Sequence, residues 1–155
     1  MRVEATVLIP APREVVVDVL NAAEDAPRWQ RGLERMEVVE GEAGVPGARA
    51  RLHYRERGRA YVMEDELLEC EPGRRWLSRV SGNGMTIRVE TQLRDVDGGT
   101  ELALVWDGAP DARVARALFW LLRPSVRRGM RADLERLAAL AASRASDAGR
   151  RDQKM

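Results

Sequence analysis

Residues 48–107 read ARARLHYRERGRAYVMEDELLECEPGRRWLSRVSGNGMTIRVETQLRDVDGGTELALVWD, and this stretch decides the fold. Runs rich in strand-forming residues alternate in it with the short turn sequences ERGR, EPGR, GNG and VDGGT. Short, glycine-containing connections of this kind close β-hairpins. The stretch therefore predicts a continuous antiparallel meander. Its five strands are expected at 48–56, 60–71, 75–81, 85–96 and 100–107.

Pairing across the first hairpin assigns its side chains to two faces. With ERGR as the turn, Leu52 lies opposite Met63. On the other face Arg51 lies opposite Glu64, which brings unlike charges together. A shift by one residue would set Leu52 against Glu64, so we favour the first register. The later turns extend the same apolar inner face, which comprises Ala48, Ala50, Leu52, Tyr54, Tyr61, Met63, Asp65, Leu67, Trp76, Ser78, Val80, Ile87, Val89, Thr91, Leu93, Leu102, Leu104 and Trp106.

Three consecutive acids, EDE at 64–66, occupy the centre of one predicted strand. Successive strand side chains point to opposite faces, so Asp65 alone faces inward. Glu64 and Glu66 point outward, where arginines of the neighbouring strands lie opposite them. Apolar surroundings disfavour a charged carboxylate, so the pKa of Asp65 is expected to be raised.

The only histidine and the only cysteine are both expected on the outer face. His53 pairs with Val62, and Cys70 pairs with Arg75 across the EPGR turn. The only lysine, Lys154, lies in the tail. This inventory lacks the ligands of a Cys/His zinc site and the lysine of Schiff-base chemistry, so we expect neither a metal nor a cofactor.

Composition limits the class of protein further. The chain has 155 residues and a net charge of +1, with basic and acidic residues interspersed, which gives no support to a nucleic-acid partner. It contains no apolar run of about 18 residues and no leading signal segment, so a cytoplasmic protein is expected.

Outside the meander, a strand is predicted at 3–9, a helix over 11–22, a short helical turn around Pro27 and Trp29, and a strand at 33–41. A helical pattern covers 111–142, and the polar remainder, 143–155, is expected to be disordered. This order predicts one α+β domain over 1–142, with a curved antiparallel sheet of about seven strands wrapped around a long C-terminal helix.

The long helix falls into two parts at Pro124. The later part carries an apolar stripe that is expected to close the concave face of the sheet, namely Val126, Met130, Leu134, Leu137 and Ala141. The earlier part, VARALFWLL at 114–122, is apolar nearly all round. Phe119 and Trp120 are adjacent, so both cannot face the sheet. Packing against the small helices, a lid over the pocket, a homodimer contact and a membrane contact all remain open.

Four segments carry a resemblance to a known family: VLIPAPREVVVDVLNAAEDAPRW, GVPGARARL, LLECEPGRRW and DVDGGTELALVW. Over about residues 3–142 the chain resembles the START/Bet v 1-like (SRPBCC) superfamily, within its polyketide cyclase/dehydrase and lipid-transport group. The resemblance implies a helix-grip fold around a ligand cavity. It also adds two residues to the expected pocket, Leu33 and Met36, which follow Trp29.

An apolar concavity with a few polar groups is typical of a small-molecule pocket. We therefore expect the chain to bind a hydrophobic, polyketide- or lipid-like molecule between sheet and helix. The residues expected to bind it are Leu33, Met36, Leu52, Tyr54, Tyr61, Met63, Asp65, Leu67, Trp76, Ser78, Val80, Ile87, Val89, Thr91, Leu93, Leu102, Leu104, Trp106, Val126, Met130 and Leu134.

Two alternatives remain open. The first is an aromatase/cyclase-type enzyme that assists aldol condensation and dehydration. Its expected catalytic residues are Asp65, Tyr54, Tyr61 and Ser78, although no arginine falls on the inner face. The second is a protein-interaction module of the co-chaperone type, for which the adjacent Phe119 and Trp120 are the only supporting feature.

Overall fold

The structure, a computed structural model, describes residues 1–154. Its strands are β1 (Arg2–Ile9), β2 (Leu33–Glu40), β3 (Arg49–Glu56), β4 (Arg59–Glu71), β5 (Arg75–Gly82), β6 (Met85–Val96) and β7 (Gly99–Pro110). Between β1 and β2 lie α1 (Arg13–Asn21), the 3₁₀ turn η1 (Ala23–Asp25) and α2 (Ala26–Trp29). The chain ends in α3 (Arg113–Phe119), the 3₁₀ turn η2 (Trp120–Leu122) and α4 (Arg123–Gln153).

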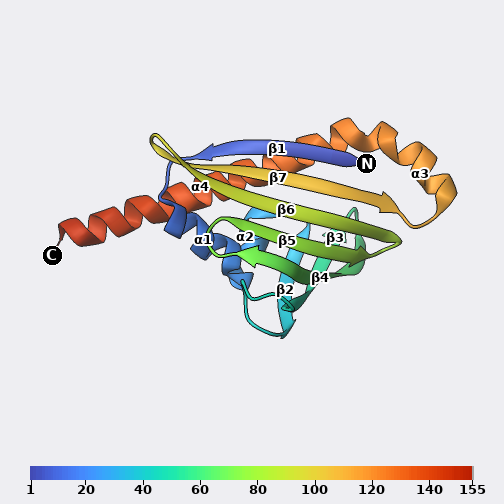
Figure 1. Cartoon of the computed structure of the whole chain (residues 1–155), viewed down its shortest axis with the longest axis horizontal. Coiled ribbons are helices and arrows are strands. Elements are labelled where there is room, and N and C mark those ends of the chain that lie inside the picture. The colour runs from blue at the N-terminus through green and yellow to red at the C-terminus, as the bar shows by residue number, and fades with distance from the viewer. Residues whose placement is uncertain (155) are drawn as a thin grey trace.

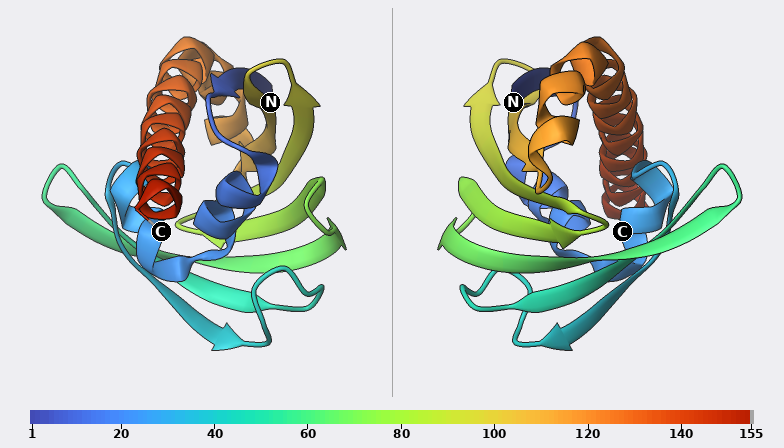
Figure 2. Two further views of the ribbon diagram at one scale, coloured as in Figure 1. Left: turned by 90° about the vertical axis from the view of Figure 1, so that its left-hand side faces the viewer. Right: turned by 90° about the vertical axis from the view of Figure 1, so that its right-hand side faces the viewer.

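The seven strands form one antiparallel sheet in the order β1-β7-β6-β5-β4-β3-β2. The sheet curves strongly, and α4 runs across its concave side (Figures 1 and 2). Strands β1 and β2 are neighbours in sequence but occupy opposite edges, so α1, η1 and α2 cross from one edge to the other. The predicted α+β helix-grip fold is confirmed.

Most of the predicted sheet register is confirmed. Leu52 pairs with Met63, and Asp65 pairs with Ala50 on one side and Val80 on the other. The tight turns take the left-handed backbone conformation that such hairpins need, with φ of 51° at Asn83 and 74° at Gly84. The turn chemistry therefore fixed which face of each strand points inward.

One pairing was wrong because β4 contains a bulge. The register shifts between Leu67 and Glu69, so Cys70 pairs with Trp76 and not with Arg75. A bulge inserts one extra residue and reverses the alternation beyond it. Cys70 therefore shares the inner face with Trp76, where the sequence placed it outside. Burial raises the pKa of its thiol.

The C-terminal segment differs from the prediction in two ways. The single helix expected over 111–142 is broken by η2, which precedes Pro124. In addition, α4 continues to Gln153, so the tail expected to be disordered is helical. Two contacts hold the first residues of this extension: Arg144 forms an ion pair with the buried Asp25, and Ala145 packs against the apolar core.

The apolar core is divided into two clusters. The first cluster joins β1, α1, β6, β7 and α4, with fully buried members that include Val3, Leu102 and Leu137. The second cluster joins α2 to strands β2–β6 and includes Leu33, Leu52, Met63, Val80 and Ile87. Trp106 packs against both clusters. The concave face between them is not filled, and this gap holds the candidate site.

Candidate ligand-binding site

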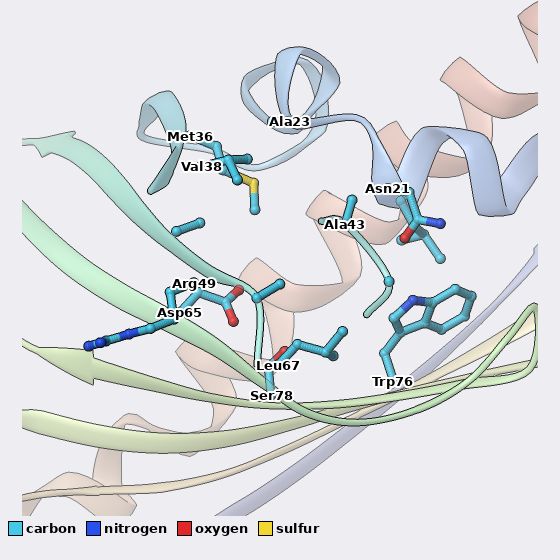
Figure 3. Close-up of a pocket in the computed structure, with 14 residues that line it drawn as sticks. Asn21, Ala23, Met36, Val38, Ala43, Arg49, Asp65, Leu67, Trp76 and Ser78 are labelled. Atoms are coloured by element: carbon cyan, nitrogen blue, oxygen red, sulfur yellow. The ribbon is translucent and has the colours of Figure 1, made fainter. Parts of the chain in front are cut away.

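A cavity of about 310 Å³ lies between the concave face of the sheet, α2 and α4. It is lined by Leu20, Ala26, Trp29, Gln30, Met36, Leu52, Tyr54, Met63, Asp65, Trp76, Ser78, Val80, Ile87, Val89, Thr91, Leu104, Trp106, Met130 and Asp133. A smaller cavity of about 120 Å³ adjoins it, and Figure 3 shows its lining. The two share Leu20, Met36, Asp65, Trp76 and Ser78, so these residues form the wall where the cavities meet.

Fifteen of the predicted ligand-binding residues line one or both cavities. They are Met36, Leu52, Tyr54, Met63, Asp65, Leu67, Trp76, Ser78, Val80, Ile87, Val89, Thr91, Leu104, Trp106 and Met130. They come from six strands, β2–β7, and from α4, and the sheet register brings the strand side chains to one face.

The other six predicted residues do not line either cavity. Leu93, Leu102 and Leu134 are buried in the first core cluster, and Val126 packs against its edge. Leu33 is buried in the second cluster, and Tyr61 packs beside it. These side chains share the inward face, but close neighbours cover them. The alternation of side chains along a strand predicts which face a residue is on, but it does not predict whether that residue lies next to the cavity.

Asp65 and Ser78 are the polar pair at the junction of the two cavities. Burial raises the pKa of Asp65, and the neighbouring Ser78 side chain offsets part of that rise because it favours the charged form. In Figure 3 the Asp65 carboxyl lies between the side chains labelled Met36 and Ser78. The raised pKa makes the protonated form of this carboxyl easier to reach than that of an exposed aspartate, which suits hydrogen bonding or proton transfer.

Two indole N–H groups in the cavity wall have no hydrogen-bond partner. The Nε1 atoms of Trp29 and Trp76 are buried and unpartnered among residues 1–154. Trp29 lines the larger cavity, and Trp76 lines both, with its ring nitrogen toward the cavity in Figure 3. An unmade hydrogen bond of this kind costs roughly 1–3 kcal/mol. Both nitrogens are almost fully covered, so an acceptor oxygen of a ligand could reach them only if neighbouring side chains moved.

Tyr54 is held in the wall of the larger cavity by two contacts. Its hydroxyl donates to Gln30 Oε1 at 3.2 Å, and its ring stacks on Tyr61 with a centroid separation of 5.2 Å. Burial raises the pKa of Tyr54, and burial together with Glu56 raises the pKa of Tyr61 to about 12. Both phenols therefore stay protonated and act as hydrogen-bonding groups at neutral pH.

Several lining residues were not predicted, mainly those from outside the meander. They are Leu20, Asn21, Ala23, Ala26, Trp29, Gln30, Val38, Ala43, Gly44, Arg49 and Asp133. Asp133 lies three residues after Met130 on α4, a spacing that does place both on one side of a helix. Burial raises its pKa, which the Arg31 backbone N–H, 3.2 Å from Oδ1, partly offsets.

The cavity offers little positive charge and no metal-binding cluster. Arg49 is the one basic residue in either lining, and its guanidinium lies near Glu40 and Glu64 and points away from the cavity in Figure 3. His53 contacts Glu37 with Nε2 and Oε2 3.1 Å apart and lines neither cavity. Within residues 1–154, no three acidic, histidine or cysteine side chains gather as metal ligands.

A curved antiparallel sheet that grips a long C-terminal helix above an internal cavity defines the helix-grip class of proteins. The chain belongs to the polyketide cyclase/dehydrase and lipid transport family, whose model matches residues 1–142. A search of curated protein sequences finds no match. No helix in the described part of the chain is long and apolar enough to cross a membrane.

Solved structures confirm the fold. The chain is similar to the Streptomyces aromatase/cyclase Zhui, with 23% identity, a TM-score of 0.72 and coverage of 93% of this chain and 94% of that one. A Rhodobacter sphaeroides protein has 25% identity, a TM-score of 0.69 and coverage of 92% and 93%. A ginseng major latex-like protein has 11% identity, a TM-score of 0.71 and coverage of 91% and 97%.

Proposed function

We propose that the chain binds a hydrophobic small molecule, polyketide- or lipid-like, in the cavity between the sheet and α4. The observation that carries this proposal is the apolar lining with two unpartnered indole donors, Trp29 and Trp76. The cavity volume of about 310 Å³ falls at the lower end of the roughly 300–1,000 Å³ usual for small-molecule sites. A ligand with carbonyl or carboxyl oxygens on an apolar skeleton fits this chemistry.

A cavity-filling substitution tests the proposal. Val89 lines the larger cavity, so Val89→Phe places added volume where the ligand would lie. We expect this variant to bind the fluorescent probe anilinonaphthalene sulfonate, an anion with an apolar ring system, about tenfold or more weakly, the scale of small volume changes in apolar pockets. Fluorescence titration and native mass spectrometry with palmitate measure the change.

The matched control makes the same substitution on the other side of the sheet. Val62 is 44% exposed and pairs with His53 on the outer face, so Val62→Phe should leave probe and palmitate affinity unchanged. Equal affinities for both variants and the unsubstituted chain would place the binding site outside the cavity and reject the proposal.

A second candidate function is aromatase/cyclase catalysis, which the buried carboxyl of Asp65 favours. A charged Asp65 can take a proton from a carbon between two carbonyl groups. That carbon then bonds to another carbonyl carbon of the same chain, and loss of water completes the condensation. Ser78 and Tyr54 supply hydroxyl groups from the same cavity.

An assay with a synthetic linear poly-β-ketone distinguishes a catalytic function from simple ligand binding. If Asp65 is the base, Asp65→Asn should retain binding of the ketone and reduce cyclised, dehydrated product by about 10²-fold or more. Chromatography of the products measures this. The catalytic hypothesis would be rejected if both proteins formed the product equally or if the unsubstituted chain formed none. The chain would then be a binding protein only.

A further inference from the structure

The segment that joins the sheet to α4 exposes an unusual amount of apolar surface. No residue of α3 or η2 is buried, although eight of the ten residues in RVARALFWLL are apolar. We call its five exposed large side chains the apolar tip. They are Val114, Leu118, Trp120, Leu121 and Leu122, with exposed fractions of 81%, 62%, 64%, 57% and 53%. A cluster of this kind marks an interaction surface.

The tip is attached to the rest of the protein on one side only. Phe119 is half-buried and lies against Trp106 of β7, with ring centroids 5.9 Å apart. Arg116 Nε donates to the carbonyl oxygen of Pro110 at 2.9 Å. In Figure 1 the tip occupies one end of the molecule, and the C-terminus lies at the other. Phe119 therefore packs against the sheet, whereas the five tip residues remain exposed and available to another partner.

Positively charged residues lie within and next to the tip in the sequence. Residues 111–131 contain six arginines and one acid, so this segment carries a charge of 6 − 1 = +5 in a chain whose total is +1. The arginines are Arg113, Arg116, Arg123, Arg127, Arg128 and Arg131, and all are exposed. Within residues 1–154 none of them forms an ion pair, whereas many other arginines of the chain do. The one acid, Asp111, accepts a hydrogen bond from Thr86.

We infer that the apolar tip and its arginines dock on an anionic lipid surface. Apolar side chains with a tryptophan enter the boundary between headgroups and acyl chains, and arginines beside them reach the lipid phosphates. Each basic residue near an anionic surface adds attraction, and six arginines act together here. The positive charge of this segment thus favours negatively charged lipids as the partner. Docking of this kind does not depend on which molecule the cavity binds.

A second copy of the chain fits the tip less well. A two-fold interface places the same patch of each copy against itself. The six arginines of one copy would then face the six of the other, with a single acid on each side to offset them. Like charges at such close range oppose association. The sequence left a homodimer contact through Phe119 and Trp120 open. We therefore treat the homodimer as an alternative outcome of the test below.

Vesicle sedimentation tests the inference. The full chain is mixed with vesicles of phosphatidylcholine alone, or of phosphatidylcholine and phosphatidylglycerol in equal amounts. We expect binding to the anionic vesicles that is at least about tenfold tighter than to the neutral ones and that weakens with salt. Trp120→Ser with Leu121→Ser should lower this binding about tenfold or more, and so should Arg123→Glu with Arg127→Glu.

Matched controls use equally exposed residues away from the tip. Leu8 of β1 is 67% exposed, and Arg150 and Arg151 are exposed near the end of α4. Leu8→Ser and Arg150→Glu with Arg151→Glu should keep the binding of the unsubstituted chain. Circular dichroism confirms that each variant is folded.

A second readout keeps the inference testable if a tip variant does not fold. Brominated lipids quench tryptophans at the headgroup boundary, so they should quench the unsubstituted chain more than Trp120→Phe, which retains an apolar side chain. Equal binding to neutral and anionic vesicles, unchanged binding of the tip variants, or no Trp120 quenching would each overturn the inference. So would a dimer in analytical ultracentrifugation that the tip variants abolish.

Discussion

Asp65 is the one member of the acidic run at 64–66 that reaches the cavity. Its neighbours Glu64 and Glu66 make surface ion pairs, with Arg49 at 3.5 Å and Arg79 at 2.7 Å. Pairs of this kind contribute little individually because water and salt screen them. The buried carboxyl differs, because its charged form has lost solvation. Three residues of similar chemistry thus have different roles through strand alternation alone.

The raised pKa of Asp65 makes a stability prediction with a definite sign. Folding favours its protonated form, so its contribution to stability is fully present below the unfolded value of about 3.9 and is lost as the pH rises through the folded pKa. Asp65→Asn removes the ionisation. The variant should therefore be more stable than the unsubstituted chain near pH 7, with the difference shrinking toward about pH 4. Urea unfolding across this range measures it.

Glu64→Gln is the matched control for that prediction. Glu64 is exposed and precedes Asp65, so its substitution should change stability by less than about 0.5 kcal/mol at any pH. If Asp65→Asn destabilises the chain near neutral pH instead, the charged carboxylate must have a favourable partner, and the desolvation argument fails.

At the scale of elements, the hairpins were predictable and the ends of elements were not. Turn chemistry and cross-strand pairs fix register locally, which is why Leu52, Asp65 and Val80 were assigned to the correct face. The bulge between Leu67 and Glu69 has no such local signal, because both residues suit a regular strand. The cavity lining contributed by α2 and by Asp133 of α4 depends on how distant elements pack, which no local pattern contains.

The length of α4 was likewise not predictable from the local sequence. Its last turns are polar and were expected to be disordered, yet Arg144 makes two hydrogen bonds to the buried carboxylate of Asp25. Asp25 is 3% exposed, and Arg144 holds the pKa of its carboxyl below the usual value. A contact between residues so far apart in the chain cannot be read from composition. It ties the α4 turn around Arg144 to the helical crossing between β1 and β2.

Truncation tests this anchor. A chain that stops after Ala145 keeps Arg144, so we expect a loss below about 1 kcal/mol in the free energy of unfolding. A chain that stops after Ala142 leaves Asp25 charged and unpaired. Its loss should be about 2 kcal/mol, below the roughly 3–5 typical of buried pairs because Arg144 is partly exposed. Urea unfolding compares the two, and equal losses would reject the anchor.

At the scale of the whole molecule, the cavity separates two apolar clusters that differ in size and in how completely their residues are buried. The first cluster has twelve buried members, several of them 0% exposed, whereas the second has six members at 4–8% exposure. Helix α4 packs along β1, α1 and α2, while strands β3–β5 face the cavity. The half of the sheet around the second cluster therefore lacks part of the packing that a filled core would give it.

This division predicts unequal hydrogen exchange. Backbone amides of β1, β7 and the middle of α4 should exchange at least about tenfold more slowly than those of β3 and β4, because local opening is easier where fewer apolar contacts must break.

Anilinonaphthalene sulfonate in excess should slow exchange in β3–β5 most, since a ligand stabilises by binding the closed form. The Val89→Phe variant should show slower exchange there without the probe and little further change with it. Uniform exchange across the sheet, or a probe effect confined to α3, would mean that the cavity is not the weak point of this fold.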